Sequence, residues 1–173
     1  MNVLVTGSSS HLAQAALPLL CDEPGIARVT GVDLVPPRFV HAKFHAVQLD
    51  IRDPGLAAML QGQDALVHLA FVVLRGRMSE AEMFDVNVTG SRKVFHAARR
   101  AGVRRLIHMS SAAVYDSGSR LGEESPIAPL PHFLYGHHKA HGAGTRALRA
   151  AFPAVNGATS AAGRCLSATV RNA

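Results

Sequence analysis

Residues 1–20 restrict the fold of this chain more than any other stretch. Residues 2–6 form a short run of β-branched and apolar side chains, which is typical of a strand buried on both faces. Gly7 and three serines follow as a turn, and Ser10 is placed to cap a helix. Residues 11–20 then carry apolar side chains at helical spacing. A strand, a glycine turn and a helix in this order predict the opening of a dinucleotide-binding unit, in which the helix N-terminus offers N–H groups to a pyrophosphate.

Strands and helices also alternate along the rest of the chain. We predict further strands at residues 27–32, 46–49, 64–70 and 104–109, and helices at residues 54–61, 79–101 and 135–151. Asp53 is expected to cap the first of these helices, and Ser79 with Glu82 to form a capping box at the second. Because helices separate the strands, we expect an α/β fold with a doubly wound parallel sheet, which is a Rossmann-like arrangement. In such sheets, ligands bind at the carboxyl ends of the strands. The residues that fall at these ends are Gly7, Asp33, Asp50, Ala70 and Ser111.

Asp33 follows the second predicted strand at about the interval expected for the acid that binds the adenosine ribose. A carboxylate there accepts hydrogen bonds from the ribose hydroxyls and repels a 2′-phosphate, which favours NAD over NADP. Arg38 is the one nearby residue that could reverse this preference. The alternative interpretation of Asp33 is a simple turn former at the end of a strand.

The composition indicates one globular domain. The chain has 173 residues, of which 48% are hydrophobic and 17% charged. We expect the domain to occupy residues 1–155. No apolar run reaches the length of a membrane span, and Met1 leads into an apolar strand without a basic leader, so we expect a cytoplasmic protein that does not bind membranes. Cys21 and Cys165 do not suggest a disulfide scaffold.

The formal net charge of +6 and the ten histidines raise two other classes of function. The arginines are scattered and are not interleaved with aromatic residues, so we predict no nucleic-acid partner. His137, His138 and His141 share one predicted helix, and His41 lies near His45. Neither group offers the three or four ligands that a metal shell needs, so we predict no metal site.

Tyr135 and Lys139 are four residues apart and would share one face of a helix. A phenol is a weak base at neutral pH, and an ammonium group beside it favours the phenolate. Such a pair can exchange a proton with an alcohol or ketone that is being oxidised or reduced. Chance spacing on an exposed helix also produces this pattern, so its significance depends on the motifs upstream.

Together these motifs resemble the short-chain dehydrogenase/reductase superfamily, in its extended, NAD-dependent epimerase/dehydratase branch. The resemblance covers about residues 2–150 and rests on six motifs in order: Thr6–Ala13, Leu49–Asp53, His68–Ala70, Asn87–Gly90, Ser110–Tyr115, and Tyr135 with Lys139. It implies an enzyme that transfers a hydride between NAD and a hydroxyl or carbonyl substrate, a class that includes nucleotide sugars.

The resemblance implies catalytic roles for three residues. Tyr135 would be the general acid/base toward the substrate oxygen. Lys139 would favour the phenolate and bind the nicotinamide ribose. Ser111 would orient and polarise the reacting oxygen.

The resemblance also implies a set of cofactor-binding residues. His11 and Leu12 would offer backbone N–H groups to the pyrophosphate, and Asp50 and Ile51 would flank the adenine. The complete set is Gly7, Ser10, His11, Leu12, Asp33, Asp50, Ile51, Leu69, Ala70, Asn87, Tyr135 and Lys139.

The chain departs from the family pattern near the cofactor and near Ser111. Ser10 stands where the family has a glycine close to the pyrophosphate, and its side chain would either crowd the phosphates or donate to them. Phe71 replaces a residue that is usually small. Ala112 and Ala113 replace the acidic pair of the nucleotide-sugar dehydratases, which disfavours dehydration and favours a redox or epimerase reaction.

Extended family members continue well beyond this length. We therefore expect a C-terminally truncated fold that lacks the substrate domain, with an atypical tail at residues 156–173 that carries no family-like strand and with weak cofactor binding and little turnover. The alternative is a nucleotide-binding sensor or scaffold without turnover. Besides a small-molecule substrate, the expected partner is a second copy, bound through helix 79–101 and the helix that carries Tyr135.

Overall fold

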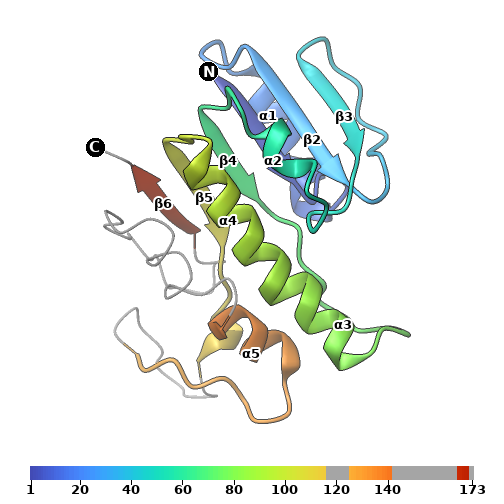
Figure 1. Ribbon diagram of the computed structural model, residues 1–173, viewed down its shortest axis with the longest axis vertical. Coiled ribbons are helices and arrows are strands. Elements are labelled where there is room, and N and C mark those ends of the chain that lie inside the picture. The colour runs from blue at the N-terminus through green and yellow to red at the C-terminus, as the bar shows by residue number, and fades with distance from the viewer. Residues whose placement is uncertain (116–124, 142–166, 172–173) are drawn as a thin grey trace.

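The computed structural model, which describes residues 1–115, 125–141 and 167–171, contains a six-stranded sheet (Figure 1). The strands are β1 (Asn2–Thr6), β2 (Arg28–Asp33), β3 (Phe44–Gln48), β4 (Ala65–His68), β5 (Arg105–Met109) and β6 (Ser167–Arg171). They lie in the order β3-β2-β1-β4-β5-β6, and β1 to β5 are parallel. From β1 the chain proceeds outward to β2 and β3, and then returns to β4 on the other side of β1. This reversal opens a crevice at the carboxyl ends of β1 and β4, which is where such sheets bind ligands.

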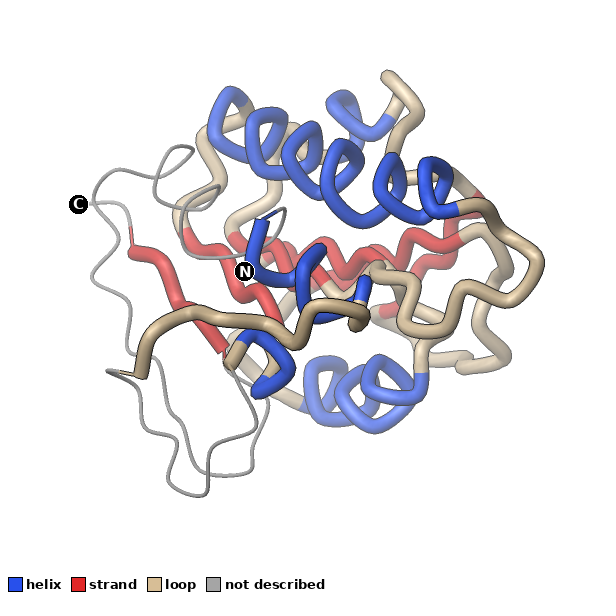
Figure 2. The backbone as a smooth tube through the Cα atoms, turned by 90° about the horizontal axis from the view of Figure 1, so that it is seen from below, coloured by secondary structure: helices blue, strands red, loops and turns tan. Residues whose placement is uncertain are grey.

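Helices cover both faces of the sheet, as the view along its edge shows (Figure 2). They are α1 (His11–Asp22), α2 (Leu56–Met59), α3 (Glu80–Phe84), α4 (Ser91–Arg100) and α5 (Leu134–His141). α1 packs on one face, and α2 and α4 pack on the other. α5 lies beyond the carboxyl end of β5 (Figure 1). The predicted doubly wound α/β fold is therefore confirmed.

The two faces of the sheet build two separate cores from alternating side chains. Val3 and Val5 of β1 pack with Leu17 of α1, whereas Leu4 points to the other face and packs with Phe95 of α4. Successive side chains of a strand point to opposite faces, so a strand that is covered on both sides must be apolar at nearly every position. This requirement explains the unbroken apolar run at the start of the chain.

The helix caps predicted at Ser10 and Ser79 are confirmed. The Ser10 hydroxyl oxygen accepts the backbone N–H of Ala13 at 3.3 Å and begins α1. Ser79 and Glu82 form a capping box at the start of α3, in which Glu82 Oε2 accepts the Ser79 N–H at 2.7 Å. Each cap satisfies N–H groups that have no carbonyl partner within the helix.

The helix predicted at residues 54–61 is wrong in its extent, because α2 contains only Leu56–Met59. Asp53 was expected to cap it, but its carboxylate instead accepts the N–H of Gly55 at 2.7 Å in a turn around Pro54. The N–H groups of Leu56, Ala57 and Ala58 bond three residues back rather than four, and Gly62 turns away with a φ of 71°.

The helix predicted at residues 79–101 is interrupted. α3 and α4 are joined by a π-helical turn, Asp85–Gly90, in the middle of the predicted span. Hydrophobic periodicity cannot reveal such a turn because it does not report which carbonyl each N–H bonds. Met83, Val88 and Phe95 of this span are buried in the core, whereas Phe84 is exposed.

The C-terminal part adds one strand to the sheet. β6 falls within the expected tail at residues 156–173 and pairs antiparallel with β5. The predicted helix beyond residue 141 and the remainder of the tail lie outside the described residues. Among the helices of the described ranges, none is both long and apolar enough to cross a membrane.

His68 at the end of β4 is fully enclosed by the fold. Its Nδ1 lies 2.7 Å from Thr6 Oγ1, and its Nε2 lies 2.9 Å from Ser91 Oγ. Its ring stacks on that of His108, with 5.6 Å between the ring centres. Burial, with a smaller contribution from the Lys139 charge, lowers the pKa of His68 to about 3. The imidazole is therefore neutral in the folded protein at every pH near neutrality.

This buried imidazole predicts loss of stability in mild acid. An unfolded histidine has a pKa of about 6.5, so below this pH the unfolded chain binds a proton at His68 whereas the folded chain does not. The free energy of unfolding therefore falls as the pH falls from 6.5 toward 3. Between pH 7 and pH 5, His68 alone contributes a loss of about 2 kcal/mol. The free energy of unfolding can be measured with urea at pH 7 and at pH 5. The difference between these two values should be smaller by about 2 kcal/mol in H68Q than in the wild-type chain.

The exposed His45 provides the control for this measurement. The H45Q variant should keep the pH dependence of the wild-type chain. Equal pH dependence in H68Q and H45Q would contradict the assignment to His68.

Candidate functional site

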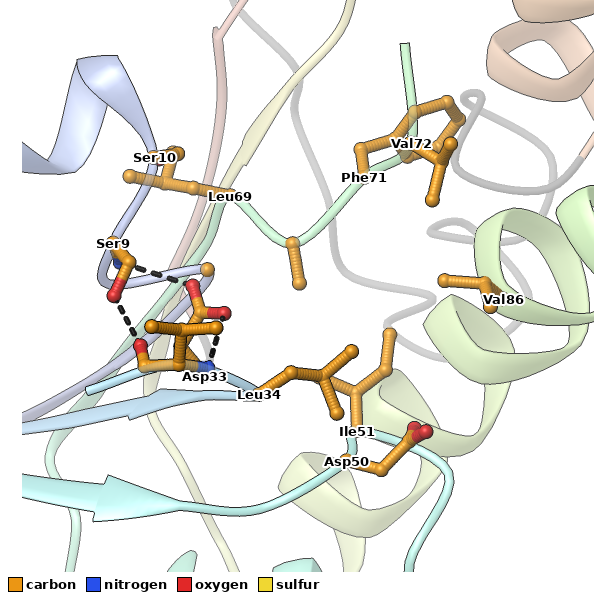
Figure 3. Close-up of a pocket in the computed structure, with 13 residues that line it drawn as sticks. Ser9, Ser10, Asp33, Leu34, Asp50, Ile51, Leu69, Phe71, Val72 and Val86 are labelled. Atoms are coloured by element: carbon orange, nitrogen blue, oxygen red, sulfur yellow. Dashed lines mark hydrogen bonds between the residues drawn. The ribbon is translucent and has the colours of Figure 1, made fainter. Parts of the chain in front are cut away.

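A pocket of about 350 Å³ opens at the carboxyl ends of β1, β2 and β4 (Figure 3). Predicted residues that line it are Gly7, Ser10, Asp33, Asp50, Ile51, Leu69 and Ala70. The lining residues that the sequence did not single out are Ser9, Leu34, Val35, Val72 and Val86. Most of these are chain neighbours of predicted residues, so extending each strand end by one or two positions would have found them.

Gly7 allows two backbone segments to meet at the base of this pocket. Its φ is 71°, a conformation that L-residues with side chains rarely adopt. A Cβ atom at this position would lie 2.4 Å from the backbone nitrogen of Ala70. The turn between β1 and α1 therefore rests directly on the segment that follows β4, and only glycine permits this contact.

Replacing Gly7 should be far more damaging than replacing another glycine with the same φ. G7A combines left-handed strain of about 1–2 kcal/mol with a backbone clash, for an expected total loss of about 3 kcal/mol in the free energy of unfolding. Gly62 also has a φ of 71°, but a Cβ there would meet no atom within 4 Å. G62A should therefore lower the free energy of unfolding only by the strain, about 1–2 kcal/mol. Equal losses of this free energy in G7A and G62A, measured by urea unfolding, would contradict the close contact at Gly7.

Asp33 lies at the rim of the pocket, at the end of β2. Its carboxylate accepts the N–H of Ser9 at 2.9 Å and the N–H of Val35 at 3.3 Å, while the Ser9 hydroxyl donates to the Val35 carbonyl (Figure 3). These bonds join the loops after β1 and β2. A carboxylate has about four lone-pair sites, so two N–H donors leave it able to accept ligand hydroxyls.

Asp50 is held by an arginine that the sequence did not single out. Arg52 donates to both Asp50 carboxylate oxygens, at 2.6 Å from Nη2 and 3.0 Å from Nε, and also to Asp85 at 2.9 Å. The Arg52 hydrogen bonds hold the pKa of the Asp50 carboxyl below its usual value. The two carboxylates in turn raise the pKa of Arg52. Arg52 thus ties the loop after β3 to the π-helical turn.

Asn87 performs a similar task from within the π-helical turn. Its side-chain oxygen accepts the Val72 N–H at 2.7 Å, and its amide group donates to the Val72 carbonyl at 2.9 Å. Asn87 is fully buried, and its Nδ2 also lies 3.3 Å from His138 Nδ1 on α5. The residue predicted to contact the cofactor therefore fixes the backbone of the pocket wall at Val72.

Loss of the Asn87 side chain should loosen the pocket wall at Val72. N87A leaves both backbone groups of Val72 without their partner, so we expect the free energy of unfolding to fall by about 2 kcal/mol and the Val72 amide hydrogen to exchange faster. Asn2 makes one exposed bond, from Nδ2 to the Gly62 carbonyl. N2A should cost less than about 1 kcal/mol, and unchanged Val72 exchange in N87A would refute the role of Asn87.

The three predicted catalytic residues lie on two neighbouring segments. Ser111 caps the short 3-10 turn Ala112–Val114, and its hydroxyl oxygen accepts the Ala113 N–H at 3.2 Å. Tyr135 and Lys139 lie on α5, which packs against this turn so closely that a Cβ on Gly136 would lie 2.4 Å from the Ala113 carbonyl oxygen. Gly136 is a structural requirement of the site that sequence analysis missed.

Lys139 is buried, with 4% of its surface exposed. Its ammonium donates to the Met109 carbonyl at 2.7 Å. The same Nζ lies 5.7 Å from the centre of the Tyr135 ring and 3.6 Å from the centre of the Phe71 ring. The lysine is therefore near the phenol, as expected, but its closest aromatic neighbour is Phe71.

Phe71 separates the two halves of the predicted site. It lines the pocket, whereas Ser111, Tyr135 and Lys139 do not. Its ring meets the Tyr135 ring edge-on, with 5.5 Å between the ring centres. The structure thus brings most predicted cofactor residues together on one side of Phe71 and the Tyr135–Lys139 pair on the other.

The remaining predicted residues lie close by. His11 and Leu12 begin α1 with exposed side chains outside the pocket lining, which agrees with a role limited to their backbone N–H groups. Arg38 is exposed in the loop after β2. Within residues 1–115, 125–141 and 167–171, no group of three or more His, Cys, Asp or Glu side chains could hold a metal ion.

The parallel sheet, its strand order and the pocket at its switch point define a Rossmann-type nucleotide-binding fold. The sequence matches the NAD dependent epimerase/dehydratase family over residues 3–161. The chain belongs to this family, within the short-chain dehydrogenase/reductase superfamily.

Known proteins with related sequences include two kinds of enzyme. UDP-glucose 4-epimerase of Mycolicibacterium smegmatis is 30% identical over 149 residues, which cover 79% of this chain and 48% of that protein. The 3 beta-hydroxysteroid dehydrogenase/Delta 5-->4-isomerase of Mycobacterium tuberculosis is 32% identical over 133 residues, which cover 71% of this chain and 35% of that protein.

A solved structure with a similar fold also belongs to the short-chain dehydrogenase/reductase superfamily. A short-chain dehydrogenase/reductase superfamily protein from Agrobacterium tumefaciens, solved with bound NAD, has a TM-score of 0.74 and 29% identity over 86% of this chain and 44% of that one. The chain thus spans about a third to a half of the length of these relatives.

Proposed function

We propose that this chain binds NAD in the pocket and uses Tyr135 to transfer a proton in an oxidoreductase or epimerase reaction on a hydroxyl or carbonyl substrate. One observation carries the proposal. Lys139 and Tyr135 project from one helix toward Phe71, and the other side of Phe71 faces a pocket at the switch point of the sheet.

The residues of the pocket fit a dinucleotide. The turn at Gly7 lies where a Cβ would collide with Ala70, so backbone rather than side chain borders the pocket there. The first turn of α1 presents N–H groups, which favour a pyrophosphate. Asp33 can accept from ribose hydroxyls, and Leu34 and Ile51 offer apolar walls suited to an adenine. Ser10 accepts the Ala13 N–H, so its own hydroxyl hydrogen can donate to a phosphate.

The chain's own residues would move the proton. Tyr135 as phenolate would take the proton of a substrate hydroxyl, or as phenol return it to a carbonyl oxygen. The Lys139 ammonium would stabilise the negative charge on that phenolate. Ser111 accepts the Ala113 N–H, so its own hydrogen can donate to the reacting oxygen. When bound, NAD would supply the hydride acceptor or donor.

The relatives suggest two substrates for a direct test. UDP-glucose represents the nucleotide sugars, and a 3β-hydroxysteroid represents the second kind of alcohol. Ala112 and Ala113, in the turn after Ser111, carry no group that could assist dehydration. We therefore expect oxidation or epimerisation rather than loss of water.

A nucleotide-binding protein without turnover is the second candidate. The position of Phe71 between the pocket and the Tyr135–Lys139 pair favours it, because this ring separates the expected cofactor site from the proton-transfer site. Binding of NAD by the wild-type chain, with no oxidation or epimerisation of either substrate, would select this alternative.

Y135F tests the proposed function. The substitution removes the exchangeable proton and keeps the ring, so we expect turnover to fall at least about 100-fold while the Kd for NAD stays within about twofold. Calorimetric titration measures the Kd for NAD. NADH formation with both substrates measures oxidation, and the fraction of UDP-glucose converted to its 4-epimer measures epimerisation, which leaves no net NADH.

The chain has only two tyrosines, so Y115F provides a matched control. Tyr115 is buried in a small cluster with Val114, and Y115F should keep most of the turnover. Undiminished turnover in Y135F would refute the role of Tyr135, and failure of the wild-type chain to bind NAD would refute the site.

A further inference from the structure

Phe71 makes contacts that would compete with a bound dinucleotide. The Lys139 ammonium lies 3.6 Å from the centre of the Phe71 ring, which is the geometry of a cation–π interaction. The ring also contacts Tyr135 edge-on. One aromatic side chain that lines the pocket therefore covers the Lys139 ammonium on one side.

The backbone beside Phe71 is anchored, whereas its side chain is not enclosed. Asn87 holds both the N–H and the carbonyl of Val72, so the chain at this point is fixed to the π-helical turn. Phe71 itself is half-buried and lies with Val72 at the end of the pocket away from Ser9 and Asp33 (Figure 3). Movement of the ring by side-chain rotation requires no change in the Val72 hydrogen bonds.

With the Phe71 ring in its observed position, the pocket suits only one end of a dinucleotide. Asp33, Leu34 and Ser10 at the start of α1 lie toward the end of the pocket that is away from Phe71 (Figure 3). The pocket volume of about 350 Å³ is at the lower end of the range of about 300–1,000 Å³ that is usual for ligand pockets. A nucleoside diphosphate can use these features while the contact between Phe71 and Lys139 stays intact.

We infer that Phe71 is an aromatic gate between the two halves of the dinucleotide site. The adenosine diphosphate half binds with the ring in place, and the nicotinamide half reaches Lys139 only after the ring has left the ammonium. This inference rests on the proposed function, since it takes Lys139 as the group that holds the nicotinamide ribose. Phe71 is then a positioning residue that selects between mononucleotide and dinucleotide ligands.

Calorimetric titration of ADP and NAD into four proteins tests the gate: the wild-type chain, F71A, F71L and F133A. The measured quantity is the ratio of the Kd for ADP to the Kd for NAD. In F71A the Lys139 ammonium loses its cation–π contact, while its hydrogen bond to the Met109 carbonyl does not involve the Phe71 ring. F71A should therefore raise this ratio at least threefold, mainly by tightening NAD, while the Kd for ADP stays within threefold.

Phe133 supplies the matched control. Its ring lies 5.6 Å from the Tyr135 ring, centre to centre, but it does not line the pocket. F133A removes an aromatic contact of Tyr135 and should leave the ratio unchanged. F71L retains bulk but has no ring face for the ammonium, so it should also raise the ratio at least threefold. If circular dichroism shows that F71A does not fold, the test rests on F71L, for which the ratio should also rise at least threefold.

The outcomes separate this inference from the proposed function. If the wild-type chain binds ADP but F71A and F71L change the ratio less than threefold, or lower it, the gate is refuted and the nucleotide site stands. An equal rise in F133A would also refute the gate, because the effect would not depend on Lys139. If the wild-type chain binds neither ADP nor NAD, the proposed function fails and the gate fails with it.

Discussion

The site depends on a direct contact between two backbones. The turn after β1 rests on the segment after β4 because Gly7 has no side chain, and a single Cβ there would come within 2.4 Å of the Ala70 nitrogen. This contact brings the N-terminus of α1 to the switch point of the sheet. Every other feature of the pocket is arranged around that position, since the loops after β2 and β3 complete its walls.

Hydrogen bonds of polar side chains hold these loops together, and most residues that line the pocket are apolar. Asp33 joins the loops after β1 and β2, Arg52 joins the loop after β3 to the π-helical turn, and Asn87 fixes Val72. A buried polar group that is fully bonded stiffens its surroundings, whereas an unbonded one would destabilise them. Three separate sets of bonds therefore tie the loops around the pocket together, and the Phe71 side chain takes part in none of them.

Much of the fold was predictable because local patterns report burial. The apolar alternation, the Ser10 and Ser79 caps and the glycine turn identified the strands and most helices, and the doubly wound fold is confirmed. The errors have local physical causes. The Asp53 carboxylate bonded Gly55 rather than starting a longer helix, and the π-helical turn has no signature in the spacing of apolar residues. β6 was not anticipated at all.

The sequence alone determined the family, the strand–helix alternation and the residue types for a dinucleotide site, because these follow from short motifs and from the burial that each segment requires. Only the tertiary structure decided how the side chains of the predicted catalytic residues lie. Lys139 faces Phe71 more closely than Tyr135, and Arg52 and Gly136 support the site although the sequence assigned neither of them a role. The physical reason is that such contacts join segments far apart in the chain, so their geometry depends on how the helices and loops pack and not on spacing along the sequence.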